Sequence, residues 1–261
     1  GNEYHAVFLD SLVYTTGKLV VLSAGNGADA NTVYAPASGI NGFVVGALQS
    51  DVSTPPYSSV AGFSSRSPST LFVPTGPGAF GITPGNDVAN ARARIDITAP
   101  GTDLELAFYG GATGGNSGGT AISGDNLYQA GLAGTSFAAP IVASGAALIV
   151  DAGKTLFPTD THAIDGRILK AVLMNSATRP AGWNNGQANV AGVITTTQAL
   201  DDTYGSGILN LGAAYNQYTA GTTDTPSLTG GTVKPVGWAF GRMTHGVTAA
   251  HDDYLLDRPL D

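Results

Sequence analysis

Apolar residues recur at helical spacing in the first segment of the chain, residues 2–17. These positions fall on one face of a helix or directly beside it: Ala6, Phe8, Leu9, Leu12 and Val13. Glycine often occupies the position just beyond the C-terminus of a helix, and Gly17 follows the last of these positions closely. The pattern therefore predicts an amphipathic helix that ends at Gly17.

Short apolar runs without helical spacing follow this helix. Residues 18–26 read KLVVLSAGN, residues 42–48 read GFVVGAL and residues 94–101 read RIDITAPG. Such runs are typical of buried strands, the first of them in a parallel sheet. Segments rich in glycine, proline, serine and asparagine, chiefly residues 75–92 and 110–130, predict loops.

Two further segments have the pattern of helices. Residues 136–150 are apolar on nearly every side, which predicts a central, buried helix. Residues 164–175 carry four apolar positions expected to face inward: Ile168, Leu169, Val172 and Leu173. Because helices alternate with buried strands, the expected fold class is α/β, with three layers and a mostly parallel sheet.

The composition changes near the C-terminus. Residues 219–232, TAGTTDTPSLTGGT, are typical of a linker. The VGWAFGRM and DDYLLD runs after it have the pattern of strands, and they would belong to a structural unit that is incomplete. We therefore expect a first domain over residues 1–218, a linker over residues 219–232 and the start of a β-rich domain over residues 233–261.

Composition and charge limit the classes of function. The 261-residue chain is 43% hydrophobic and 11% charged, which is typical of a globular protein. A formal net charge of -8 argues against nucleic acid as a partner, because such binding needs clustered Lys and Arg. The chain has no cysteine, which excludes disulfides and thiolate metal sites. No long apolar run occurs, so we expect no membrane span.

The GTSFAAP stretch, residues 134–140, places a hydroxyl where it can do chemistry. Ser136 lies at the start of a predicted helix, among backbone N–H groups without intrahelical partners and at the positive end of the helix dipole. An oxyanion formed there is stabilised, which suits a nucleophile that attacks a carbonyl. The alternative is that Thr135 or Ser136 simply caps a buried helix.

Other motifs favour the chemical interpretation. SAGN ends one predicted strand, APG ends another, FSS lies between them and YGSGILNLGAA follows the later helix. In this order, the segments resemble the subtilisin-like serine peptidases, also called subtilases, over about residues 1–215. The family pattern around the nucleophile is G-T-S-x-A-x-P, and GTSFAAP matches it at every fixed position.

The resemblance implies a role for each matching residue. Ser136 would be the nucleophile that is acylated, and the Asn26 amide would bind the oxyanion together with the Ser136 backbone N–H. A turn residue is the alternative for Asn26, because asparagine tolerates left-handed backbone angles. The substrate-binding residues would be Ser23, Ala24, Gly25, Gly134 and Thr135. The substrate would be a protein or peptide.

The chain also differs from the family pattern in one respect. Family members have a catalytic Asp and His upstream of SAGN, in D-[ST]-G and HGTHVAG motifs, and neither motif occurs here. Asp10, followed by Ser11 and Leu12, imitates the first motif inside a helix, and we interpret it as a solvated helix residue. His5 and His162 are expected at the surface. His245-Gly246 lies downstream without the second histidine, and the His251-Asp252-Asp253 run is interpreted as a solvated tail.

We therefore expect the C-terminal part of a peptidase domain, incomplete at its N-terminal side. Its catalytic Asp and His would belong to the missing N-terminal half, and the chain alone would be inactive and poorly soluble. The alternative is a non-catalytic binding or structural module. The family implies a secreted or extracytoplasmic protein. Some family members bind structural calcium, and Asp201 and Asp202 are candidates for contributing ligands to such a site.

Overall fold

A computed structural model describes residues 4–28, 33–51, 57–66, 68–71, 88–107, 128–222, 231–232, 236–241 and 254–255. Its centre is a four-stranded sheet formed by β1 (Val21–Ser23), β2 (Phe43–Gln49), β6 (Ile97–Pro100) and β3 (Ser59–Val60). β2 pairs in parallel with β1 on one side and with β6 on the other, while β3 runs antiparallel to the end of β2. The sheet is therefore mostly parallel, as predicted.

The two faces of β2 pack against different layers. Phe43, Val45 and Ala47 belong to the main core, which also contains the inner face of α2 (Thr135–Leu156). Val44 lies in a second core on the opposite face. Alternation along a strand produces this division, because successive side chains point to opposite faces.

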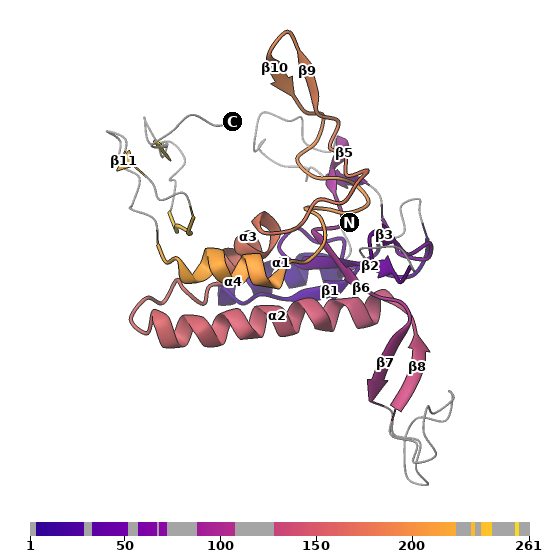
Figure 1. The fold of residues 1–261 in the computed structure, drawn as a ribbon, viewed down its shortest axis with the longest axis horizontal. Coiled ribbons are helices and arrows are strands. Elements are labelled where there is room, and N and C mark those ends of the chain that lie inside the picture. The colour runs from indigo at the N-terminus through magenta and orange to yellow at the C-terminus, as the bar shows by residue number, and fades with distance from the viewer. Residues whose placement is uncertain are drawn as a thin grey trace.

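α1 (Tyr4–Thr16) belongs to the layer of the second core, because Leu9 of this helix and Leu22 of β1 both contact Gly42. α3 (Gly166–Asn175) and α4 (Leu211–Thr219) pack with α2 in the other layer. Figure 1 shows the long α2 running along the sheet. The three-layer α/β fold is confirmed.

Three two-stranded hairpins extend from this framework, each antiparallel. They are formed by β4 (Pro68–Leu71) with β5 (Val88–Ala93), β7 (Leu104–Ala107) with β8 (Tyr128–Leu132), and β9 (Ala188–Val190) with β10 (Val193–Thr195). The β7–β8 and β9–β10 hairpins project from the body on different sides (Figure 1). A further short parallel pair joins β11 (Gly231–Thr232) to β12 (Tyr254–Leu255).

Most predicted elements are present, but several differ from the prediction. β5 and β8 occupy the ends of the two segments predicted as loops. α4 was not predicted, because only Ala214 and Tyr218 of its nine residues are buried and the apolar periodicity is correspondingly weak. α2 is longer than predicted, and it is buried on one side only among the described residues. Residues 236–241 are not a strand.

The segment that contains Trp238 packs onto the main core. Trp238 is 6% exposed, its ring stacks on Tyr218, and its indole N–H donates to the Tyr218 carbonyl over 3.0 Å. Phe157 completes this aromatic group with an edge contact to both rings. Trp238 is thus part of the main core. The predicted domain boundaries themselves stay predictions.

Among helices in the described residues, α2 is long and apolar enough to cross a membrane by length and composition. Its inner side packs on the sheet.

Candidate active site

Ser136 is the second residue of α2, and its side chain is exposed. Gly134 precedes the helix with a φ of 155°, a conformation that favours glycine. The Phe137 amide already donates to the Gly134 carbonyl, which closes the first turn over 3.0 Å. The Ser136 amide belongs to this first turn, where backbone donors have no intrahelical acceptor. The hydroxyl of Ser136 and its amide, which has no acceptor among the described residues, thus both lie at the positive end of the helix.

The SAGN segment reaches this helix end from the carboxyl end of β1. The Ala24 amide donates to Val45 on β2, which continues the strand pairing by one residue. Ser65, which is fully buried, then holds the loop twice: its amide donates to the Gly25 carbonyl, and its hydroxyl accepts from the Gly27 amide over 3.0 Å. Ser65 belongs to the FSS motif, and no local pattern in the sequence indicated this role for it.

Thr135 joins the loop to the helix through three hydrogen bonds. Its amide and its hydroxyl both approach Oδ1 of Asn26, at 3.0 and 2.9 Å. The Gly25 amide donates to the Thr135 hydroxyl over 3.1 Å. Asn26 therefore lies against the residue that precedes Ser136, although no hydrogen bond joins Asn26 to Ser136 itself within the described residues.

Gly101 connects the end of β6 to the start of α2. Its amide donates to Leu48 of β2 over 3.1 Å, and its carbonyl accepts from the Gly134 amide over 2.8 Å. A Cβ at Gly101 would lie 2.4 Å from Cβ of Ala47, so no other residue fits without movement. The APG motif is therefore a close-packing site beneath the start of α2.

The structure brings most of the predicted site residues together. Ala24, Gly25, Asn26, Gly134, Thr135 and Ser136 converge at the carboxyl ends of β1 and β6. Ser23 is the last residue of β1 and is half-buried. Thr135 is fully buried and Ala24 is 2% exposed. The roles inferred from the resemblance stay predictions.

The solvated interpretation of Asp10 is wrong. Its carboxylate accepts hydrogen bonds from the Ile40 and Asn41 amides at 2.7–2.9 Å, and a Cβ at Gly39 would lie 2.8 Å from it. Asp10 therefore ties α1 to the loop before β2. The sequence hid this role, because the acceptor and its donors are 30 residues apart.

Of the other polar residues considered in the sequence analysis, two histidines are described by the structure and the rest are not. His5 and His162 are exposed, as predicted; His162 stacks on Phe240 and lies 3.3 Å from Asp160. His245 and the His251-Asp252-Asp253 run lie outside the described residues.

Asp201 and Asp202, the candidate calcium contributors, have different surroundings in the described part of the chain. The carboxylate of Asp201 accepts from the backbone amides of Asn184, Thr203 and Tyr204, so its oxygens are already engaged. Burial raises the pKa of Asp202, and one of its buried oxygens has no partner in the described part of the chain. Calcium takes six to eight oxygen ligands, and the described residues contain no group of three or more acidic, His or Cys side chains for a metal. Structural calcium stays a prediction.

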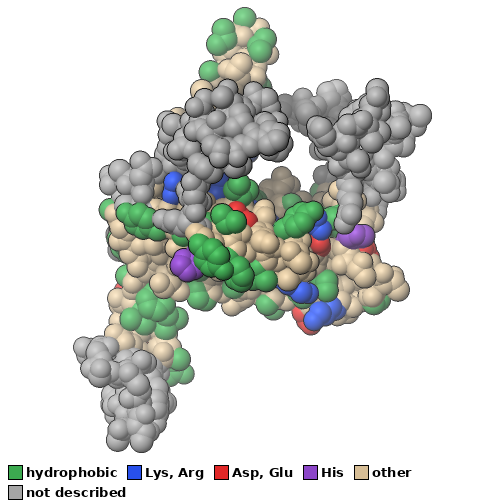
Figure 2. All heavy atoms as spheres, turned by 180° about the vertical axis from the view of Figure 1, so that it is seen from behind, with side chains coloured by type: hydrophobic (Ala, Val, Ile, Leu, Met, Phe, Trp, Pro, Cys, Tyr) green, Lys and Arg blue, Asp and Glu red, His purple; other side chains and the backbone are tan. Residues whose placement is uncertain are grey.

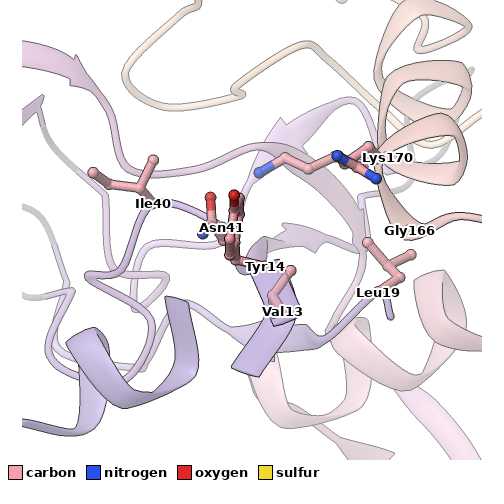
Figure 3. Close-up of a pocket in the computed structure, with 8 residues that line it drawn as sticks. Val13, Tyr14, Leu19, Ile40, Asn41, Gly166 and Lys170 are labelled. Carbon is pink, nitrogen blue, oxygen red and sulfur yellow. The ribbon is translucent and has the colours of Figure 1, made fainter. Parts of the chain in front are cut away.

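A cavity of about 280 Å³ lies elsewhere, between α1, the loop before β2 and the start of α3. Figure 3 shows Lys170 reaching from α3 toward the part of this cavity that Asn41 lines. Its ammonium group donates to the Gly42 carbonyl over 2.7 Å and lies 3.1 Å from the buried Asp96 carboxylate. The cavity is thus bordered by a cation that already has structural partners.

The sequence profile of the Subtilase family of peptidases matches residues 3–207. The chain belongs to the subtilase family. The match contains every predicted site residue, from Ser23 to Ser136. No curated protein sequence matches this subtilase.

Solved structures share the subtilase fold at low sequence identity. Fervidolysin from Fervidobacterium pennivorans, a keratinolytic enzyme related to subtilisin, has a TM-score of 0.54 and 22% identity, over 83% of this chain and 25% of its own. A lanthipeptide protease has a TM-score of 0.53 and 17% identity, over 81% and 54%. The patellamide maturation protease PatA has a TM-score of 0.50 and 21% identity, over 83% and 56%. The subtilase chain therefore spans little more than half the length of these proteins, or less.

Proposed function

We propose that this chain supplies the nucleophile and the oxyanion site of a serine endopeptidase. Ser136 would attack the carbonyl of a peptide bond and form an acyl-enzyme, which water then hydrolyses. The observation that carries the proposal is the attachment of Asn26 to Thr135. It holds the Asn26 oxygen against the helix and leaves the amide nitrogen available to an oxyanion beside Ser136.

The proton acceptor for Ser136 would come from residues outside these 261. A serine hydroxyl without a neighbouring base is a weak nucleophile near neutral pH. In subtilisin, disabling the nucleophile or the base lowers kcat by about 2 × 10⁶. We therefore propose that the catalytic His and Asp lie in the N-terminal half of the same domain, and that the chain alone is inactive.

Three surfaces of the described structure support the proposal that an N-terminal half of the domain packs against this chain. Among the described strands, β1 pairs with β2 alone, so its other edge is open. α1 exposes a stripe of large apolar side chains: Tyr4, Val7, Phe8 and Leu12. Figure 2 shows hydrophobic side chains gathered on the face of the molecule opposite to the one seen in Figure 1. α2 exposes a second, smaller apolar surface that consists of Ala143, Ala147 and Leu148. A parallel strand beside β1 with a helix on each face would cover all three.

Labelling with a fluorophosphonate probe tests the proposal. In the full-length protein, Ser136 is expected to be modified and Ser136→Ala to remain unlabelled. The isolated 261-residue chain is expected to be labelled at a background rate. Equal labelling of the isolated chain would refute the external base. An unmodified Ser136 in a folded, mature full-length protein would refute the peptidase and support the alternative, a non-catalytic binding or structural module.

We also propose that the protein acts outside the cytoplasm, where many subtilases act. Fractionation of cells that express the full-length protein tests this location: the mature protein is expected in the medium or the extracytoplasmic fraction, and its retention in the cytoplasm would contradict the proposal.

A further inference from the structure

Asparagine followed by glycine is the dipeptide most prone to deamidation, because glycine carries no side chain to hinder its amide nitrogen. The chain contains three such pairs: Asn26–Gly27, Asn41–Gly42 and Asn185–Gly186. We propose that Asn26–Gly27 is a latent deamidation site, which the Ser65 side chain protects by holding the Gly27 amide. The consequence for catalysis rests on the proposed peptidase function, whereas the modification itself does not.

The reaction joins two groups of neighbouring residues. The main-chain nitrogen of Gly27 attacks Cγ of Asn26, so that an N–Cγ bond forms and the Cγ–Nδ2 bond breaks. The proton of the Gly27 amide leaves with the Asn26 amide group as ammonia, and a five-membered succinimide ring remains. Water then opens the ring at either carbonyl, which gives an aspartate or an isoaspartate. The net change exchanges the side-chain amide for a carboxylate and needs only water.

Burial does not protect Asn26–Gly27, since both residues are exposed and water reaches them. The Gly27 N–H instead donates to the hydroxyl of the fully buried Ser65 over 3.0 Å. Attack on Cγ requires this nitrogen to lose its proton and turn toward the Asn26 side chain, so the hydrogen bond must break first. Ser65 is itself fixed, because its amide donates to the Gly25 carbonyl over 2.9 Å.

The Asn185–Gly186 pair gives a comparison within the same chain. Oδ1 of Asn185 has no partner in the described part of the chain, whereas Oδ1 of Asn26 accepts two hydrogen bonds. The Gly186 amide donates over 2.7 Å to the side chain of Asn184, which is exposed and belongs to the same loop. That acceptor is not anchored in the interior as Ser65 is. We therefore expect Asn185 to deamidate faster than Asn26, although Asn26 is the more exposed of the two.

Deamidation of Asn26 would disable the proposed oxyanion site. A carboxylate would replace the two N–H donors of the amide and would place a negative charge beside the oxyanion that forms at Ser136. Loss of such an amide alone lowers kcat by roughly 10²–10³, and the added charge should lower it at least as far. The activity of a sample should therefore fall in proportion to the fraction of its chains that are modified at Asn26.

The test measures deamidation in the full-length protein with Ser136→Ala, which prevents self-digestion during incubation in a mildly alkaline buffer. Mass spectrometry of peptides follows the change in mass at each asparagine. Ser65→Ala is expected to raise the rate at Asn26 by about twofold to tenfold, the factor that corresponds to one lost hydrogen bond. The rates at Asn41 and Asn185 in the same digests should not change, which separates lost protection from general unfolding.

A second variant tests the route of the reaction. Gly27→Ala places a methyl group beside the attacking nitrogen, and Gly27 is not among the residues with a positive φ, so alanine fits the backbone there. Combined with Ser65→Ala, it should suppress the increase at Asn26. If melting shows that Ser65→Ala prevents folding, Ser65→Cys replaces it, because a thiol is of similar size and accepts hydrogen bonds only weakly.

Two results would overturn the proposal: an unchanged rate at Asn26 in Ser65→Ala, or equal rates at Asn26 and Asn185 while Ser65 is present. Activity is followed separately, in protein that retains Ser136, as kcat per titrated active site on a peptide p-nitroanilide. Deamidation of Asn26 without a fall in kcat, or a wild type that cleaves no peptide, would refute the proposed function and not the protection by Ser65.

Discussion

The Gly134 amide donates to the Gly101 carbonyl over 2.8 Å, which joins the end of β6 to the residue that starts α2. Gly101 in turn donates to Leu48 of β2. The start of α2 is therefore held by the central sheet, and not only by the loops around it. The close approach at Gly101 makes this connection sensitive to a single added carbon.

Gly101→Ala is expected to destabilise the protein by about 1–3 kcal/mol, because the new methyl group would overlap Cβ of Ala47. Gly62→Ala is the matched control, since a Cβ there meets nothing within 4 Å. Thermal unfolding followed by circular dichroism measures both. If Gly101→Ala and Gly62→Ala have the same Tm, the end of β6 accommodates the added methyl group without a loss of stability, and the prediction is wrong.

Ser65→Ala should loosen the loop that carries Asn26. The exposed Gly27 amide would lose its hydroxyl acceptor, and the loss of one such hydrogen bond costs about 0.5–1.5 kcal/mol. We expect a lower Tm and a lower kcat in the full-length enzyme. Ser59→Ala, at an exposed position on β3, is the control. Unchanged kcat in the Ser65 variant would mean that Thr135 holds the loop alone.

Asp165 caps α3 by accepting from the Arg167 amide over 2.9 Å. Asp165→Ala should cost about 1 kcal/mol, whereas Asp165→Asn should cost less, because asparagine is also a good N-cap. The double variant Asp165→Ala with Arg167→Ala should be close to the alanine single variant, because replacing Asp165 alone already removes the ion pair with Arg167. Urea unfolding measures all three.

The surroundings of Asp165 also predict that the stability of the folded state depends on pH. The side-chain hydrogen bond from Arg167 holds the pKa of Asp165 below its usual value of 3.8. The carboxylate therefore stabilises the folded state fully above 3.8, and this contribution is lost as the pH falls through the lowered pKa. The difference in stability between wild type and Asp165→Asn should shrink over that acidic range. A difference that stays constant there would contradict the assignment.

Trp238→Ala should destabilise the protein by about 3–5 kcal/mol, because it empties a buried aromatic site against Tyr218 and Phe157. Trp238→Phe should recover part of this loss, although the Tyr218 carbonyl would lose the indole N–H and keep only the Gly221 amide as a donor. Val236→Ala, at an exposed position nearby, is expected to change Tm little. Equal melting of the alanine variants at 236 and 238 would show that the segment does not belong to the core.

Elements with strong periodicity could be predicted from the sequence. Leu9 and Leu173 lie on regular apolar faces, and both are buried as their spacing indicates. α4 and the β9–β10 hairpin were missed for a common reason. Their residues are largely exposed, among them Val190 and Ile194, so packing does not impose the alternation that marks a strand or helix.

The sequence by itself determined the family, the helix on which Ser136 lies and the loop that carries Asn26, because these depend on local motifs and short-range periodicity. Only the tertiary structure decided that Thr135 bonds to Asn26 and that Asp10 serves the loop before β2. Those bonds join residues 109 and 30 positions apart. The direction of a hydrogen bond over such a separation depends on how the sheet and helices pack, and no local pattern in the chain encodes it.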